Sequence, residues 1–179
     1  MKFTEIYLEG AYVIETEPRH DDRGSFERSF CAKEFGERAL RTAFVQSNLS
    51  KSKSKHTIRG MHFQMRGAEE AKLVRCIKGK IWDVIIDIRS SSETYTKHFG
   101  IELSEGNNKL LYVPEGFAHG FITLEENSEV IYQVSNYYTP GKEEGIRWND
   151  PLFNIQWPTT EPIISAKDAS HPNYIPIVV

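Results

Sequence analysis

His62 lies in the middle of a largely apolar stretch, RGMHFQ, at residues 59–64. A histidine at such a position could be a structural core residue, a metal ligand or a general base, because imidazole exchanges protons near neutral pH. Its polar neighbours favour a functional reading. Buried polar groups on adjacent strands are costly unless they bind one another or a ligand. These neighbours are Gln46, Asn48, Arg59, Lys72 and Arg75.

Arg59 and Lys72 indicate what such a site would bind. Either cation could simply extend to solvent at the rim of a sheet. A cluster of cations inside a cavity more often recognises an anion, however, and the planar guanidinium of arginine suits phosphate.

The same two cations would repel a divalent metal. Phe63 and Gln64 follow His62, where a metal-binding site would need a second histidine. Glu69 or Glu70 could still supply a carboxylate, so a site of two histidines and one carboxylate is not ruled out by count. We nevertheless predict no catalytic metal and no cofactor.

Two further segments carry groups that could move protons. In EVIYQVSNYYTP, residues 129–140, Tyr132 lies in an alternating run, so its phenol could enter the same cavity as His62 and donate a proton to a carbanion. Its neighbour Tyr137 we interpret as an aromatic favoured by strands. The pair Lys167-Asp168 would be solvated unless the tail folds back to the mouth of the barrel.

The segments that position these residues have the sequence pattern of β-strands. Residues 72–89, KLVRCIKGKIWDVIIDIR, contain two β-rich runs on either side of Lys78-Gly79-Lys80, which predicts a hairpin there. Further turn signals occur at residues 105–108, 114–116 and 125–127. This spacing is typical of an all-β sandwich or barrel, and we predict a β jelly roll. Helical periodicity predicts one short helix, over residues 31–40.

Composition places the chain in an ordinary globular class. Its 179 residues predict a single domain over residues 1–179, with residues 159–179 wrapping around it. The net charge of −3 gives no basic field, so we expect no nucleic-acid partner. No apolar run reaches about 18 residues, and the N-terminus lacks a signal-peptide pattern, so we expect no membrane. Cys31 and Cys76 form no CxxC motif, which favours a reduced, cytoplasmic setting.

The segment VPEGFAHGF, residues 113–121, has the spacing Pro114-x-Gly116-x-x-His119, which resembles the second motif of the cupin superfamily of small double-stranded β-barrels. Taken together, the motifs of residues 10–170 resemble the dTDP-4-dehydrorhamnose 3,5-epimerases in content and order. They are DDRGSFERSF, VQSNLSKS, RGMHFQ, KLVRC, WDVIIDIR, YVPEGFAHGF, NYYTP, WNDPLFNIQWP and SAKD. The resemblance implies a metal-free cupin-type barrel that forms a homodimer by exchanging N-terminal strands, which would also cover sheet edges.

The resemblance also implies a reaction on a nucleotide-linked 4-keto-6-deoxyhexose, most simply dTDP-4-dehydro-6-deoxy-D-glucose. The ketone at carbon 4 acidifies the protons on carbons 3 and 5. By similarity, His62 is the base and Asp168 fixes its tautomer. Lys72 would hold the developing oxyanion. Tyr132 would return the proton from the opposite face.

The remaining matches are substrate-binding positions. By similarity, Arg23 and Arg59 contact the diphosphate, Gln46 and Asn48 contact the substrate, and His119 contacts the sugar-phosphate region. Glu143 and Lys167 also fall at contact positions, and Arg23 would reach a neighbouring subunit's site. Arg28 stands near the nucleotide end where the family usually has glutamate, so the nucleotide base stays open.

Four alternatives also stay open. The enzyme could invert carbon 3 alone, or it could be a 5-epimerase of a different, CDP- or GDP-linked ketosugar. The chain could also be a non-catalytic sugar-nucleotide-binding cupin, or a metal-dependent cupin isomerase or dioxygenase.

Overall fold

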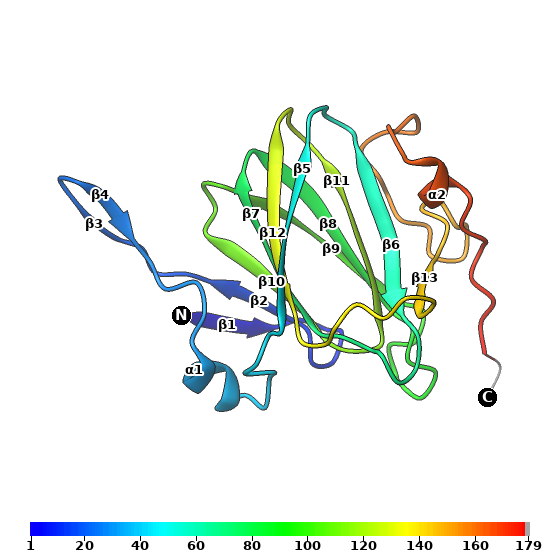
Figure 1. Cartoon of the computed structure of the whole chain (residues 1–179), viewed down its shortest axis with the longest axis horizontal. Helices are drawn as coiled ribbons and strands as arrows, with labels where there is room; N and C mark the ends of the chain where they lie inside the picture. The colour runs from blue at the N-terminus through cyan, green and yellow to red at the C-terminus, as the bar shows by residue number, and fades with distance from the viewer. Residues whose placement is uncertain (178–179) are drawn as a thin grey trace.

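The computed structural model describes residues 1–177, and its regular secondary structure is mostly strands in two facing sheets (Figure 1). The six-stranded sheet contains, in spatial order, β1 (Lys2–Glu5), β2 (Tyr12–Glu15), β10 (Lys109–Val113), β7 (Lys72–Lys78), β12 (Ser128–Val134) and β5 (Gln46–Ser52). The five-stranded sheet contains β13 (Glu143–Gly145), β6 (Ile58–Gln64), β11 (Phe117–Thr123), β8 (Lys80–Asp87) and β9 (His98–Ser104). Neighbouring strands pair antiparallel throughout both sheets. The prediction of an all-β, cupin-type jelly roll is confirmed.

The predicted hairpin at Lys78-Gly79-Lys80 is wrong. β7 pairs with β10 and β12, whereas β8 pairs with β9 and β11, so the chain crosses from one sheet to the other at Gly79. Gly79 has a φ of +71°, and a Cβ there would lie 2.6 Å from the Ser128 hydroxyl oxygen. A glycine is needed for such a turn whether it closes a hairpin or a crossing, so the local pattern cannot distinguish the two.

Strand β8 is buried on both faces, which explains its nearly continuous apolar sequence. Ile81 and Ile85 belong to the core between the two sheets. Val84 and Ile86 pack on the outer face of the five-stranded sheet, where the C-terminal region covers them. The covering side chains are Phe153, Ile155, Trp157 and Tyr174. This packing brings the C-terminal region back to the barrel; residues 178 and 179 of the predicted wrap lie outside the described residues.

The predicted helix exists but is shorter than residues 31–40. Helix α1 spans Ala32–Gly36 and buries Phe35. The chain then turns, and Ala39 adopts a φ of +57°, which a continuing helix does not allow. A second short helix, α2 (Ala166–Ala169), begins after Ser165, whose hydroxyl accepts a hydrogen bond from the Asp168 N–H at 3.0 Å. No helix within residues 1–177 has the length and apolar character needed to cross a bilayer.

The hairpin of β3 (Arg19–Asp21) and β4 (Gly24–Phe26) extends away from the barrel as an arm (Figure 1). Every residue of its two strands is exposed. The chain rejoins the body at Glu27, whose carboxylate accepts hydrogen bonds from Thr16 and Arg75. The arm therefore has a fixed base and a free tip.

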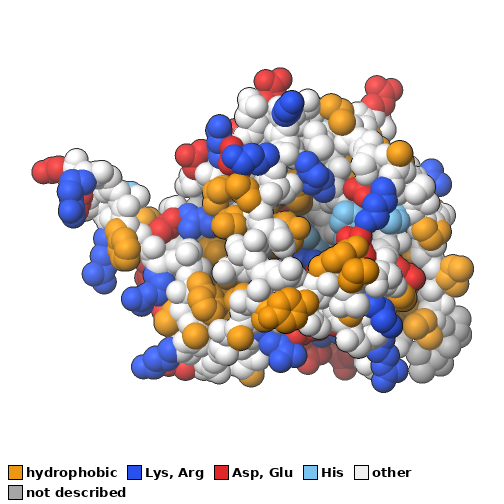
Figure 2. Space-filling model, viewed as in Figure 1, with side chains coloured by type: hydrophobic (Ala, Val, Ile, Leu, Met, Phe, Trp, Pro, Cys, Tyr) orange, Lys and Arg blue, Asp and Glu red, His pale blue; other side chains and the backbone are white. Residues whose placement is uncertain are grey.

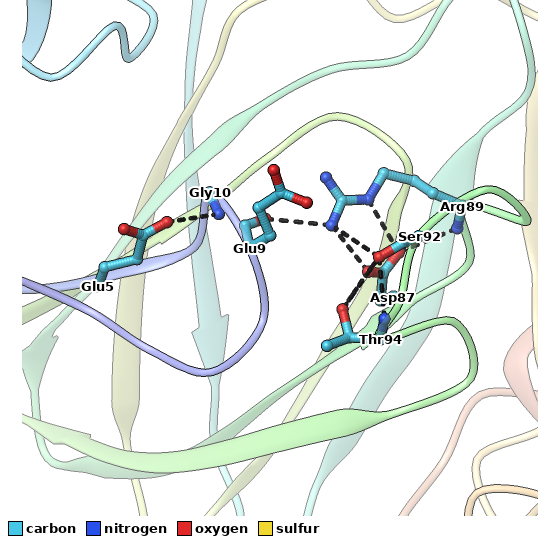
Figure 3. Close-up of polar contacts among 7 residues, drawn as sticks. All are labelled: Glu5, Glu9, Gly10, Asp87, Arg89, Ser92 and Thr94. Carbon is cyan, nitrogen blue, oxygen red and sulfur yellow. Dashed lines mark hydrogen bonds and ion pairs between the residues drawn. The ribbon is translucent and has the colours of Figure 1, made fainter.

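Asp87 organises the loop between β8 and β9 (Figure 3). Its fully buried carboxylate accepts hydrogen bonds from Arg89 at 2.7 Å, Ser92 at 2.6 Å and Thr94 at 2.7 Å. Arg89 also donates to the Glu9 carbonyl at 3.1 Å and so joins this loop to the turn between β1 and β2. Burial opposes ionisation of Asp87, but these hydrogen bonds outweigh it and lower the pKa of the carboxyl group.

We expect Asp87→Ala to lower the free energy of unfolding by about 3 kcal/mol, because it leaves the partly buried donors of Arg89, Ser92 and Thr94 without their acceptor. Urea denaturation followed by tryptophan fluorescence measures the change. Glu9→Ala is the matched control, since Glu9 contacts Arg89 through its backbone carbonyl and its side chain is exposed. Equal denaturation midpoints for the two variants would contradict this role for Asp87.

Candidate active site

A cavity of about 330 Å³ opens between the two sheets. Strands β5, β7 and β12 of one sheet, strands β6, β11 and β13 of the other, and α2 all contribute side chains to it. Figure 2 shows the hollow, with histidine side chains beside acidic and basic ones. Its lining residues are Gln46, Asn48, Ser50, Arg59, His62, Glu70, Lys72, His119, Phe121, Tyr132, Val134, Tyr138, Glu143, Ser165, Lys167 and Asp168. The structure therefore brings together all the predicted site residues except Arg23 and Arg28.

Strand pairing explains why residues distant in sequence meet here. His62 on β6 lies opposite His119 on β11, and Tyr132 on β12 lies opposite Asn48 on β5. β12 pairs on its other side with β7, where Lys72 lies opposite Val134. Because side chains alternate between the two faces of a strand, these registers place several of them on the inner faces of the sheets.

His62 and Asp168 form a hydrogen-bonded pair. The His62 Nε2 lies 2.9 Å from Asp168 Oδ1, and Asp168 Oδ2 accepts the Gly60 N–H at 3.1 Å. Burial raises the pKa of Asp168, but the bonds from His62 and Gly60 outweigh burial and lower it below its usual value. The carboxylate is therefore ionised and can only accept, so the His62 Nε2 carries the proton. The Nδ1 is left with a free lone pair that can act as a base.

Lys72 and Tyr132 lie near each other on the neighbouring strands β7 and β12, and both line the cavity. Lys72 is only 8% exposed, and its ammonium is paired with Glu70. The Lys72 Nζ is 6.0 Å from the centre of the Tyr132 ring. Burial, followed by the negative charges of Glu70 and Glu143, raises the pKa of Tyr132. The phenol is therefore protonated at neutral pH and available as an acid.

His119 is held by a carboxylate that the sequence reading did not assign to the site. Its Nε2 lies 3.0 and 2.9 Å from the two oxygens of Asp83, which is fully buried. Burial raises the pKa of Asp83, while His119 acts in the opposite direction. An acidic residue inside the apolar run of β8 was the signal for such a partner.

The other predicted binding residues make contacts of their own around the cavity. Lys167 pairs with Glu143. Arg59 donates to the Ser52 hydroxyl at 3.2 Å and to the Lys51 carbonyl at 3.0 Å. The Gln46 side-chain oxygen accepts the Tyr138 N–H at 2.7 Å. Tyr138, Ser50, Phe121, Val134, Glu70 and Ser165 line the cavity without having been predicted as site residues.

Arg23 and Arg28 do not lie in the cavity of their own chain. Arg23 is on the tip of the β3–β4 arm, where its side chain is 90% exposed and donates to Asp21. Arg28 is near the base of the arm, 3.8 Å from Glu34, and lines a separate hollow of about 380 Å³. Within one chain, these two arginines cannot reach a ligand bound between the sheets.

Comparison with known proteins agrees with this geometry. A family model described as dTDP-4-dehydrorhamnose 3,5-epimerase matches residues 5–175. The dTDP-4-dehydrorhamnose 3,5-epimerase of Salmonella typhimurium is 45% identical over 162 residues, which cover 89% of this chain and 88% of that protein.

Two solved structures are similar over nearly the whole chain. The dTDP-4-dehydrorhamnose 3,5-epimerase of Bacillus anthracis str. Ames, with TDP and PPi bound, superposes with a TM-score of 0.94 at 40% identity, covering 97% of this chain and 99% of that one. The dTDP-6-deoxy-D-glucose-3,5-epimerase of Legionella pneumophila Philadelphia 1, in complex with dTDP-4-keto-L-rhamnose, has a TM-score of 0.90 at 35% identity, covering 96% and 92%. This chain therefore belongs to the dTDP-4-dehydrorhamnose 3,5-epimerase family.

Proposed function

We propose that the protein converts dTDP-4-dehydro-6-deoxy-D-glucose to dTDP-4-dehydro-L-rhamnose by inverting carbons 3 and 5. The observation that supports this most directly is the presence of a base, an acid and a buried cation in one cavity, namely His62, Tyr132 and Lys72. Membership of the family and the ligands named for its solved relatives support the same substrate.

The first half of the reaction is proton abstraction. The ketone at carbon 4 makes the neighbouring C–H protons acidic, because the electron pair left behind delocalises onto the ketone oxygen. The free Nδ1 of His62 takes the proton, and the Asp168 carboxylate stabilises the resulting imidazolium. Lys72 stabilises the negative charge on the oxygen, in a cavity where burial strengthens this interaction.

The second half is proton return from the other face of the sugar ring. The protonated phenol of Tyr132 gives its proton to the carbanion, which inverts the carbon and restores the ketone. The tyrosinate then recovers a proton from solvent, and His62 releases the one that it took. No electron is gained or lost overall, so the reaction balances as an isomerisation.

A homodimer would complete the binding site. The β3–β4 arm projects from the barrel with exposed strands, and Arg23 stands at its tip (Figure 1). Inserted at a partner's cavity, the arm would bring Arg23 to the diphosphate and Arg28 towards the nucleotide, and the pairing would cover exposed sheet edges. Light scattering coupled to size-exclusion chromatography checks the expected dimer mass.

The two cysteines give information about the cellular compartment of the protein. Cys31 and Cys76 are both free thiols. Burial raises the pKa of Cys76 to about 11, which makes this thiol unreactive. Free thiols suit a reducing compartment, and we infer the cytoplasm.

Hydrogen exchange tests the proposed function. The protein is incubated with dTDP-4-dehydro-6-deoxy-D-glucose in deuterated water, and NMR follows deuterium at carbons 3 and 5. Label at both carbons with formation of the L-rhamno product is the expected result. Label at carbon 3 alone would indicate the narrower 3-epimerase. No label at either carbon would refute this substrate, and CDP- and GDP-linked ketosugars would then be compared.

Asp168→Asn is expected to lower kcat about a hundredfold while the fold persists. The asparagine oxygen can still accept the Gly60 N–H, which leaves its NH₂ group facing the His62 Nε2. The Nε2 must then accept, so the proton moves to Nδ1 and blocks the base. Steady-state turnover measures the loss, and the thermal midpoint reports the fold. An unchanged kcat would show that Asp168 does not set the tautomer.

A further inference from the structure

His171, just beyond α2, lies against the pair of His62 and Asp168 without belonging to any predicted site motif. Its side chain is only 13% exposed. Within residues 1–177, its Nε2 is buried and has no hydrogen-bond partner. The His171 ring lies edge-on to the His62 ring, with 5.8 Å between the ring centres. An unsatisfied ring nitrogen beside a carboxylate is costly, and a ligand would satisfy it.

The three side chains present ligand atoms to one point. The Asp168 Oδ1 lies 2.9 Å from the His62 Nε2 and 3.7 Å from the His171 Nε2. The three ligand atoms all lie within 4.8 Å of one another. In a tetrahedral site with bonds of about 2.0 Å, the ligand atoms are roughly 3.3 Å apart. Changes of about 0.4 Å in the first two distances, and of at most about 1.5 Å in the third, would therefore form three of the four positions of such a site.

The surroundings hold these groups in place, and carboxylates offset part of the positive charge near them. A Cβ at Gly145 would collide with the His171 ring, so the ring rests directly on strand β13. The ammonium of Lys72 is neutralised by Glu70, and that of Lys167 by Glu143. The repulsion expected from Lys72 is thus offset by Glu70, whereas the guanidinium of Arg59 is bonded to Ser52 and to the Lys51 carbonyl and keeps its charge. Two imidazoles and one carboxylate form a donor set that Zn²⁺ takes readily.

We propose that His62, Asp168 and His171 form an inhibitory site for a divalent transition metal of the zinc class. The inhibitory part of this proposal depends on the proposed function, in which His62 is the base. Coordination uses the Nε2 lone pair, so the neutral ring carries its proton on Nδ1, the atom that must accept the proton of the substrate. The proton moves from one ring nitrogen to the other and none is lost. The metal also occupies Asp168, so the loaded enzyme lacks both its base and the support of that base.

The binding step is tested without substrate. Protein freed of metal by chelation and dialysis is titrated with Co²⁺, whose visible absorption reports tetrahedral coordination, and with Zn²⁺ by calorimetry. We expect one ion per chain, and we expect His171→Ala to weaken Zn²⁺ binding at least tenfold. His56→Asn is the matched control, because it removes a histidine outside the cavity at a residue with a φ of +61° that asparagine tolerates. His171→Gln, which preserves a polar side chain of similar size, serves if the alanine variant is unstable.

The inhibitory step is tested by deuterium exchange at increasing Zn²⁺. Wild type and His56→Asn are expected to lose exchange and to recover it with a chelator. His171→Ala is expected to keep its metal-free rate, within about twofold of wild type, and to resist Zn²⁺.

Absence of stoichiometric Co²⁺ or Zn²⁺ binding, or equal binding by His171→Ala and wild type, would overturn the site. Activity that requires added metal would overturn the inhibitory role and the metal-free mechanism together. Stoichiometric binding to a protein that lacks exchange activity would instead refute only the proposed function and the inhibition built on it.

Discussion

His62→Asn is expected to reduce turnover by about a thousandfold or more and to leave the barrel folded. The imidazole is the group placed to take a proton from the sugar, with its Nε2 hydrogen bonded to an ionised carboxylate and its Nδ1 free. Asparagine can still donate to Asp168, but it cannot act as a base at neutral pH. The His62 side chain is 30% exposed, so its replacement costs little packing.

Deuterium exchange separates this expectation from a general loss of binding. Without the base, exchange at carbons 3 and 5 is expected to stop together with inversion, while affinity for dTDP stays close to that of wild type. His56→Asn is the matched control, since it makes the same change outside the cavity, at a residue with a φ of +61° that asparagine tolerates. Exchange at the normal rate in His62→Asn would remove His62 from the role of base.

Local patterns in the sequence predicted where strands occur better than they predicted which strands pair with one another. Alternation and turn signals gave the all-β class and the turns at residues 105–108, 114–116 and 125–127, because both depend on neighbouring residues. The sheet to which a strand belongs depends on pairing between distant segments, which is why Gly79 was assigned to a hairpin instead of a crossing. The end of α1 was misplaced for a similar reason. Residues 37–40 have helical composition, but the chain turns so that Phe35 packs against Tyr112.

Site residues that belong to a family motif could be predicted from the sequence. Residues whose role depends only on contacts in the folded chain could not. His62, Lys72, Tyr132 and Asp168 line one cavity as expected. The role of Asp83 was not predicted, because its pairing with His119 depends on the contact between β8 and β11 and not on neighbouring residues. His171 carried no signal at all. Its relation to His62 arises only when the C-terminal region returns to β6, a contact between residues that are far apart in sequence.

Tyr132→Phe is expected to separate proton abstraction from inversion. The substitution removes only the hydroxyl group, and the ring keeps its packing against the core between the sheets. His62 can still abstract a proton, exchange it with solvent and return it to the same face. Deuterium should therefore accumulate in unconverted substrate, while inversion falls by about a hundredfold to a thousandfold. NMR of one reaction in deuterated water gives both rates.

Tyr137→Phe is the matched control, because Tyr137 is 63% exposed and lies outside the cavity lining. Its exchange and inversion rates should equal those of wild type. Inversion at the normal rate in Tyr132→Phe would assign the acid to another group, whereas loss of exchange as well would show that the phenol assists abstraction. Only the combination of retained exchange and lost inversion places the acid and the base on opposite faces of the sugar. That combination follows from a cavity in which His62 projects from one sheet and Tyr132 from the other.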